Sequence, residues 1–237
     1  MVAVLAAPGT ASAGLTHYGW LNGTDVLPER GAEVQTWVAE ENGTPGNAHE
    51  TALWWGAVVG ITDRLELSLP VEMVWADSDA AGPSFTAQRF GVEARYRFVS
   101  NDPVDAPPFA PLARVAVKRD IVERGDVRVE ADLVASTVTE SGSVHVLVDV
   151  GFAGDITRDA HHFALLPGAG ASFTVAGDLR LGAEVFSELS LDTKRDGWVA
   201  AGPNLGWTHG RFWLSAAFGI GLYNIDTAPK VVWGIMF

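Results

Sequence analysis

The feature that most constrains the fold is an alternation between apolar and polar residues with a period of two. In residues 65–75 every odd position is apolar, whereas the even positions include Glu66, Ser68 and Glu72. Residues 89–98 repeat the pattern, with arginine, glutamate or glycine at every odd position. Successive side chains of a β-strand point to opposite faces, so each segment predicts a strand with one apolar face and one ionic face.

Alternating segments follow one another along most of the chain. The twelve predicted strands are 32–40, 50–59, 65–75, 89–98, 112–118, 127–135, 144–152, 163–175, 179–185, 198–207, 211–223 and 230–237. Tight turns are expected at 62–64, 176–178 and 208–210, and longer connections at 101–109 and 137–142. An even number of strands of about 9 to 11 residues is typical of membrane barrels whose termini share one side. We therefore predict an all-β fold, a transmembrane antiparallel up-and-down β-barrel of about 12 strands over residues 32–237.

A soluble β-sandwich shows the same alternation, and other features of the chain favour the barrel over it. The ionic faces contain glycines such as Gly91 and Gly182, which make room inside a barrel but only weaken a strand that faces solvent. Aromatic residues stand at strand ends, as they do in the interfacial girdles of membrane barrels. These residues are Trp37, Trp75, Trp198, Trp207 and Phe237.

The last eight residues form an apolar strand that would invite aggregation in water. Its apolar residues share one parity, and they are Val231, Trp233, Ile235 and Phe237. The polar Lys230 stands seven positions before the final residue, and Val232 stands where a glycine is often found. This end resembles the sorting signal that outer-membrane barrels present to their assembly machinery. The resemblance implies a Gram-negative outer-membrane location, periplasmic termini, and membrane lipid and the assembly machinery as partners.

Residues 1–13 match part of a signal peptide. The apolar run of residues 2–7 precedes Ala11-Ser12-Ala13, which fits the small-residue pattern before a cleavage site. The run is short and no basic residue precedes it, so a start codon assigned too late and an Ala-rich disordered tail are the alternatives. Residues 14–31 are expected to form a periplasmic tail, and the sequence leaves open whether they plug the barrel or hang free.

Composition argues against helical membrane spans, cysteine chemistry, nucleic-acid binding and a metal site. No stretch approaches the roughly 18 to 20 consecutive apolar residues of a spanning helix. The absence of cysteine removes disulfides, thiolate nucleophiles and Cys-ligated metals. A net charge of -13 argues against a nucleic-acid partner, which would need clustered lysine and arginine. His161 and His162 lack a third ligand nearby, so we expect neither a metal site nor a cofactor.

Placing the ionic parity inside the barrel predicts a charged lumen that passes small solutes. The predicted lumen residues are Glu66, Glu72, Arg89, Glu93, Arg95, Arg97, Arg114, Lys118, Arg128, Glu130, Asp132, His145, Asp149, Arg180, Glu184 and Arg211. The first three strands contribute only acids and the next three mostly bases, which suggests a path between an acidic wall near Glu66 and Glu72 and a basic wall near Arg95, Arg97 and Arg114. The alternative is that these charges pair with one another and plug the barrel.

Two other functions compete with the channel, namely a barrel hydrolase acting on lipids or esters and a closed structural barrel. Ser143, His145 and Asp149 share the inward parity of one strand. However, positions i and i+4 of a strand lie roughly 13 Å apart, so Asp149 cannot orient His145 without a partner on another strand. The sequence contains neither a nucleophile-elbow motif nor a metalloprotease motif. We therefore expect a protein that is not an enzyme.

A looser similarity concerns two short segments, residues 26–34 (VLPERGAEV) and residues 59–67 (VGITDRLEL). Both resemble the opening segments of outer-membrane transporters in the MetA-pathway phenol-degradation family. This resemblance covers roughly the first third of the chain. It implies that the solutes are small and aromatic, and a carboxylate-bearing solute would suit the charged lumen.

Overall fold

The computed structural model describes residues 16–44, 47–78, 82–101, 107–192 and 197–237, so the predicted signal segment 1–13 lies outside the described residues. Twelve strands follow one another along the chain. They are β1 (Ala32–Thr44), β2 (Asn47–Thr62), β3 (Leu65–Ser78), β4 (Gly82–Arg97), β5 (Phe109–Asp120), β6 (Val127–Val138), β7 (Val144–Ile156), β8 (His161–Ala176), β9 (Leu179–Ser190), β10 (Trp198–His209), β11 (Phe212–Tyr223) and β12 (Thr227–Met236). No helix among the described residues is long and apolar enough to cross a membrane.

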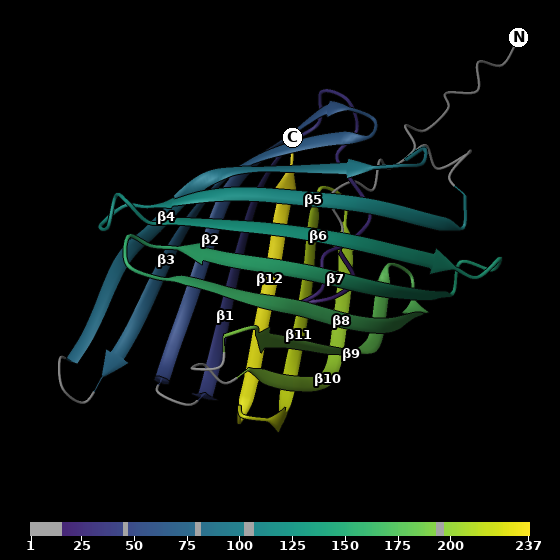
Figure 1. The fold of residues 1–237 in the computed structure, drawn as a ribbon. Helices are drawn as coiled ribbons and strands as arrows, with labels where there is room; N and C mark the ends of the chain where they lie inside the picture. The colour runs from purple at the N-terminus through teal and green to yellow at the C-terminus, as the bar shows by residue number, and fades with distance from the viewer. Residues whose placement is uncertain (1–15, 45–46, 79–81, 102–106, 193–196) are drawn as a thin grey trace, which may run out of the picture.

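The strands close into one antiparallel barrel (Figure 1). Each strand pairs with its neighbours in sequence, and β1 pairs with β12 from Glu33↔Met236 to Asn42↔Thr227. Closure leaves no free sheet edge, which is how a barrel avoids pairing with other chains. The predicted 12-stranded up-and-down barrel is therefore confirmed, and the sandwich is excluded.

Strand boundaries differ from the prediction mainly at one end of the barrel. β4 begins at Gly82, seven residues before the predicted start at Arg89, because its ladder with β3 continues through Trp75↔Phe85 to Ser78↔Gly82. Backbone hydrogen bonds do not require the side-chain alternation that reveals a strand in the sequence. The three predicted tight turns are present between β2 and β3, β8 and β9, and β10 and β11.

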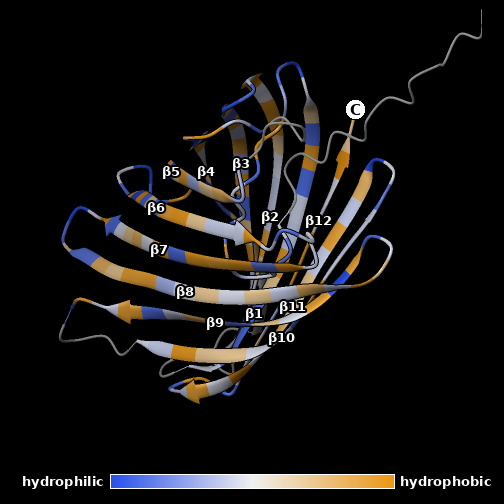
Figure 2. Ribbon diagram, turned by 90° about the vertical axis from the view of Figure 1, so that its right-hand side faces the viewer, coloured by the Kyte–Doolittle hydropathy of each residue, from blue (hydrophilic) through white to orange (hydrophobic). Residues whose placement is uncertain are grey.

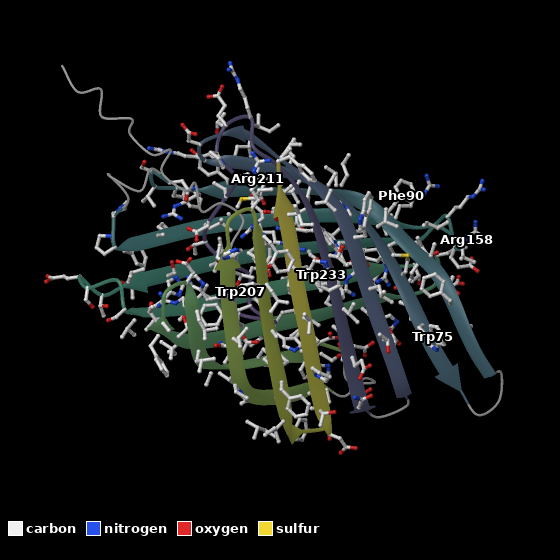
Figure 3. All side chains as sticks on the ribbon, turned by 180° about the vertical axis from the view of Figure 1, so that it is seen from behind. Trp75, Phe90, Arg158, Trp207, Arg211 and Trp233 are labelled. Carbon is white, nitrogen blue, oxygen red and sulfur yellow. The ribbon has the colours of Figure 1, made fainter. Side chains whose placement is uncertain are left out.

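The outer surface of the barrel is apolar. Hydrophobic and hydrophilic residues alternate along the strands (Figure 2). Residues such as Leu69, Leu133 and Phe218 are 62%, 66% and 50% exposed, although each stands within a strand. Exposed apolar side chains on every other position form the band that membrane barrels turn toward lipid. Trp75 and Trp207 belong to this outer surface, as Figure 3 shows.

Two of the aromatic residues assigned to an interfacial girdle face the interior instead. Trp198 is buried against Phe186, and Trp37 packs against the buried Trp54. Position at a strand end does not decide which face a residue occupies, whereas parity does. Trp37 shares the parity of the buried Glu33 and Ala39, so the girdle assignment of Trp37 and Trp198 was wrong.

Residues 16–28 lie inside the barrel, and residues 29–31 follow at its rim, where the side chains of Glu29 and Arg30 are exposed. We call residues 16–31 the lumen segment. We call the end at which β1 begins and β12 finishes the terminal end, and the other the distal end. At the terminal end the backbone N–H of Arg30 donates to Gly60 and the hydroxyl of Ser215 donates to the carbonyl of Thr16. Between these points Tyr18, Leu21, Val26 and Leu27 are buried. The segment is thus a loop that fills the terminal part of the lumen rather than a tail outside it.

Candidate functional site

Main-chain groups of the lumen segment are bound by charged side chains of the barrel wall. The N–H groups of Trp20, Asn22 and Leu27 donate to carboxylates of three different strands. The pairs are Trp20 with Glu184 at 2.9 Å, Asn22 with Asp149 at 2.9 Å and Leu27 with Glu66 at 2.7 Å. Charge-assisted hydrogen bonds of this kind are stronger than neutral ones. Three predicted lumen acids therefore hold the segment in place.

Two arginines of β4 bind the same segment through its carbonyl groups. Arg95 donates to the carbonyl of Gly23 at 2.6 Å, and Arg97 donates to that of Thr24 at 3.0 Å. Arg97 also forms an ion pair with Asp25 at 2.5 Å. Both arginines are buried, so these bonds are shielded from water.

Inward glycines make room for the lumen segment. A Cβ atom at Gly170 would lie 2.5 Å from the ring of Tyr18, and one at Gly168 would collide with Leu21. A Cβ at Gly60 would overlap the carbonyl oxygen of Pro28. Glycine at these positions allows close approach of the segment to the wall.

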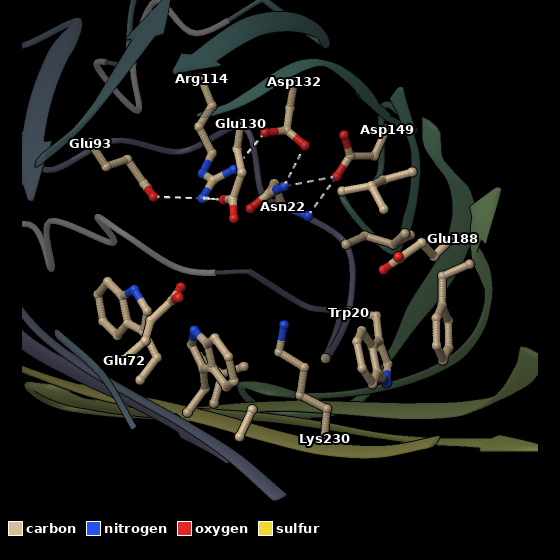
Figure 4. A pocket seen from close by; sticks show the side chains of 18 of the residues that line it. Trp20, Asn22, Glu72, Glu93, Arg114, Glu130, Asp132, Asp149, Glu188 and Lys230 are labelled. Atoms are coloured by element: carbon tan, nitrogen blue, oxygen red, sulfur yellow. Dashed lines mark hydrogen bonds and ion pairs between the residues drawn. The ribbon is translucent and has the colours of Figure 1, made fainter. Parts of the chain in front are cut away.

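Above the lumen segment, toward the distal end, the lumen contains a cavity of about 470 Å³. Its floor includes Trp20, Leu21 and Asn22, and its lining reaches Glu41 and Glu188 near the distal strand ends (Figure 4). This volume is within the range of small-molecule sites, which is about 300–1,000 Å³.

One side of the cavity is a network of ion pairs on β3 to β7, which we call the charged wall (Figure 4). Arg114 lies at its centre and contacts Glu93 at 2.7 Å, Glu130 at 2.7 Å and Asp132 at 2.6 Å. Lys118 contacts Glu130 at 2.9 Å. The remaining ion pairs of the charged wall are Lys118–Glu72, Arg89–Glu72, Arg89–Asp155, Arg128–Glu130 and Arg128–Asp155.

The ion pairs contradict the hypothesis of separate acidic and basic walls with a path between them. Glu66 lies directly opposite Arg95 in the β3–β4 register, and the two side chains are 3.2 Å apart. Glu72 contacts Lys118 at 2.5 Å. Glu66 and Arg95 lie on adjacent strands, and Glu72 reaches Lys118 across β4, so acidic and basic side chains contact and neutralise each other.

The other side of the cavity is lined by Trp20, Trp37, Trp54, Phe186 and Trp198, which we call the aromatic side. Trp20 stacks on Phe186 with ring centroids 4.7 Å apart. The ammonium group of Lys230 lies 4.8 Å from the centroid of Trp20 and 4.7 Å from that of Trp37. Figure 4 shows Lys230 pointing into the cavity from the side opposite Arg114.

The predicted lumen residues are divided among three places. Those that line the cavity are Glu72, Arg89, Glu93, Arg95, Arg114, Lys118, Arg128, Glu130, Asp132 and Asp149. Glu66, Arg97, His145 and Glu184 are buried against the lumen segment, where His145 contacts the hydroxyl of Tyr18 at 3.0 Å. Arg180 donates to Thr174 near the terminal end, and Arg211 is exposed in the turn between β10 and β11, away from the cavity.

The tryptophans of the cavity are the main residues that sequence reasoning missed. Trp54 and Trp198 share the inward parity of their strands, a signal that was present in the sequence. Trp20 precedes the first strand, where no alternation indicates its direction. Only the packing of the lumen segment places Trp20 at the cavity.

The residues considered for hydrolysis do not form a catalytic set. The hydroxyl of Ser143 lies 2.6 Å from that of Ser141, and Nδ1 of His145 is 3.0 Å from the hydroxyl of Tyr18. Asp149 binds the amide of Asn22. Within the described part of the chain, no hydrogen bond joins Ser143 to His145.

Comparisons with known proteins find the fold in outer-membrane proteins. An outer-membrane channel from Pseudomonas putida F1 is 14% identical with a TM-score of 0.57, covering 90% of this chain and 97% of that one. The KdgM porin in complex with disordered oligogalacturonate is 14% identical with a TM-score of 0.56, covering 86% and 99%. The β domain of the Bordetella autotransporter BrkA is 13% identical with a TM-score of 0.58, covering 87% and 99%.

No protein-family model and no curated protein matches the sequence. The structural likeness therefore shows the fold. Channels and an autotransporter share this fold, so the function must be argued from the lumen itself.

Proposed function

We propose that this protein is a channel of the bacterial outer membrane that passes small solutes through its lumen. The observation that carries the proposal is the combination of an apolar outer surface with a polar cavity of about 470 Å³ inside the barrel. A lipid-facing exterior around a charged interior is typical of membrane barrels that conduct solutes.

The outer-membrane location rests on the barrel and on the C-terminal strand. Val231, Trp233, Ile235 and Phe237 lie on the outward parity of the last strand and its end, as the resemblance to the sorting signal requires. We propose that both termini are periplasmic, because the barrel has an even number of strands.

The solute path proposed here runs through the cavity and past the lumen segment. Because the charged wall neutralises itself, it offers little net field to a permeating ion. The aromatic side offers the rings of tryptophan and phenylalanine side chains instead. This supports a small solute with an aromatic part, in agreement with the resemblance of residues 26–34 and 59–67 to the phenol-degradation family.

Conductance in planar lipid bilayers tests the proposal. We expect discrete conductance steps from the folded protein, and a several-fold decrease for Ala52→Trp, which fills part of the cavity that Ala52 lines. Ala57→Trp is the matched control, because Ala57 has the opposite parity on the same strand and faces outward. If folded wild-type protein conducts nothing, the channel proposal is wrong. If the wild-type protein conducts and both variants conduct equally, the proposed path through this cavity is wrong.

A closed structural barrel is the second candidate, and the lumen segment is the observation that favours it. The segment is held by three carboxylates and two arginines, so a lumen blocked permanently is the natural competing interpretation. The conductance measurement separates the two functions directly.

A further inference from the structure

Lys230 differs from the other cations of the cavity in its surroundings. Its ammonium group lies between the faces of Trp20 and Trp37, at 4.8 and 4.7 Å from their ring centroids. Trp37 comes from the barrel wall and Trp20 from the lumen segment, so both parts of the chain contact the Lys230 ammonium group. Cation–π contacts stabilise a charge without neutralising it.

Among the described residues, every other basic side chain that lines the cavity has an acidic partner. Arg89, Arg114, Lys118 and Arg128 belong to the charged wall, and Arg95 pairs with Glu66. In the part of the chain that the structure describes, no carboxylate lies within ion-pair distance of Lys230. Lys230 is therefore the positive charge that an entering anion can reach without breaking an existing ion pair.

A carboxylate lies beside this lysine on the neighbouring strand β1. Lys230 is paired with Ala39 in the β1–β12 register, so Glu41 stands two residues along the same inward face of β1. Glu41 is directly opposite Glu50 on β2, and both line the cavity. Glu41 therefore offers a carboxylate to the cationic group of a ligand that also reaches Lys230.

An apolar surface adjoins these charges. Trp54, Phe186 and Trp198 line the same cavity, and Phe186 packs edge-on against Trp198. Aromatic faces favour contact with a flat apolar or aromatic group of a ligand. The cavity thus presents an accessible cation, a nearby carboxylate and aromatic side chains.

We propose that the cavity binds a small zwitterion with an aromatic body, such as an aromatic amino acid. Its carboxylate binds Lys230, its ammonium group lies toward Glu41, and its ring packs on the aromatic side. This proposal deepens the proposed channel function by naming the class of solute. A polyanion is disfavoured because Glu41, Glu50 and Glu188 all line the distal part of the cavity.

Equilibrium dialysis of the folded full-length protein in detergent micelles, with radiolabelled L-phenylalanine as the probe, tests the proposal. Two unlabelled competitors each lack one charge: 3-phenylpropanoate has no ammonium group and 2-phenylethylamine has no carboxylate. We expect each to compete about tenfold or more weakly than unlabelled L-phenylalanine, because each leaves one charged hydrogen bond unmade.

Two variants test which residue binds each charged group of the ligand. Lys230→Met is expected to weaken the binding of L-phenylalanine and 3-phenylpropanoate about tenfold or more, while 2-phenylethylamine binds at least as tightly as before. Glu41→Gln is expected to weaken the binding of L-phenylalanine and 2-phenylethylamine and to leave the binding of 3-phenylpropanoate unchanged. Arg158→Met is the control, because Arg158 is an exposed cation in the turn between β7 and β8 (Figure 3). Heat-modifiable migration on gels verifies that every variant is folded.

Three outcomes overturn the proposal. Equal competition by 3-phenylpropanoate indicates a simple anion site, equal competition by 2-phenylethylamine indicates a simple cation site, and the absence of saturable L-phenylalanine binding indicates no site of this class. None of these results depends on conductance, so the channel can stand while the zwitterion site fails. Conversely, saturable binding without conductance would reject the channel alone.

Discussion

At the scale of single residues, Arg114 is the cation with the most ion pairs among the described lumen residues. It holds three carboxylates, those of Glu93, Glu130 and Asp132, within 2.7 Å. Removing the cation leaves these acids close together with fewer partners. Breaking a buried ion pair by removing one member typically costs about 3–5 kcal/mol, because the remaining charge is uncompensated.

We therefore expect Arg114→Met to lower the free energy of unfolding by about 3 kcal/mol or more. Urea titration of the protein in lipid vesicles measures the change. Arg119→Met is the matched control on the same strand, because Arg119 is exposed and its guanidinium bonds only a turn carbonyl, that of Arg124. An unfolding midpoint of Arg114→Met equal to that of the control would show that the charged wall is not held together by this residue.

The direction of these side chains could be predicted from the sequence, whereas their pairing could not. Parity alone places Glu66, Glu72, Arg95 and Arg114 inside. Which of them touch depends on the register between strands, which the turns and bulges set. β3 and β4 shift register between Glu72 and Met73, and nothing in the local sequence pattern reveals such a bulge. The sequence pattern therefore predicted two separate walls, whereas ion pairs join them in the structure.

At the scale of elements, the lumen segment depends on acceptors that lie far away in sequence. The carboxylate of Glu184 accepts the N–H of Trp20 at 2.9 Å. Replacing the carboxylate by a neutral amide oxygen weakens the bond, since hydrogen bonds to charged groups contribute roughly 1 kcal/mol more than neutral ones.

Glu184→Gln should accordingly accelerate amide hydrogen exchange in the lumen segment about fivefold, which corresponds to roughly 1 kcal/mol. Exchange followed by mass spectrometry on peptides covering residues 16–31 measures the effect. Glu140→Gln provides the control, because Glu140 is exposed in the turn between β6 and β7. Unchanged exchange in Glu184→Gln would mean that this carboxylate does not restrain the segment.

The placement of this element was beyond the reach of the sequence for a physical reason. Residues 16–31 show no alternation, since they form neither strand nor helix, and their backbone groups bond to side chains instead of to a ladder. The available signal was indirect. Gly168 and Gly170 occupy successive inward positions of β8, which indicates that something must approach the wall there.

At the scale of the whole molecule, the apolar exterior predicts how stability depends on depth in a bilayer. Leu133 lies near the middle of β6 and is 66% exposed, whereas Thr137 lies on the same face near the end of that strand. A lipid-facing arginine costs about 2–4 kcal/mol at the midplane and about 0–1 kcal/mol near the interface.

We expect Leu133→Arg to lower the free energy of unfolding in lipid vesicles by about 2–4 kcal/mol, and Thr137→Arg by no more than about 1 kcal/mol. Urea titrations of both variants in the same vesicles give the comparison. Similar small losses for the two arginines would contradict a membrane placement of the barrel. The fold itself was predictable at this scale, because one parity rule holds for all twelve strands.

Main-chain N–H groups hold the lumen segment, so its side chains can change during evolution without loss of these hydrogen bonds. The donors to Glu184, Asp149 and Glu66 are main-chain N–H groups, and every residue type except proline supplies one. Mutations at positions 20 and 22 can therefore alter the shape and polarity of the cavity floor, and mutations at position 27 the packing against Trp54, while the loop stays tethered. Homologous barrels could in this way exchange one ligand preference for another through substitutions in the segment, with the acids of the wall retained and proline absent from these three positions.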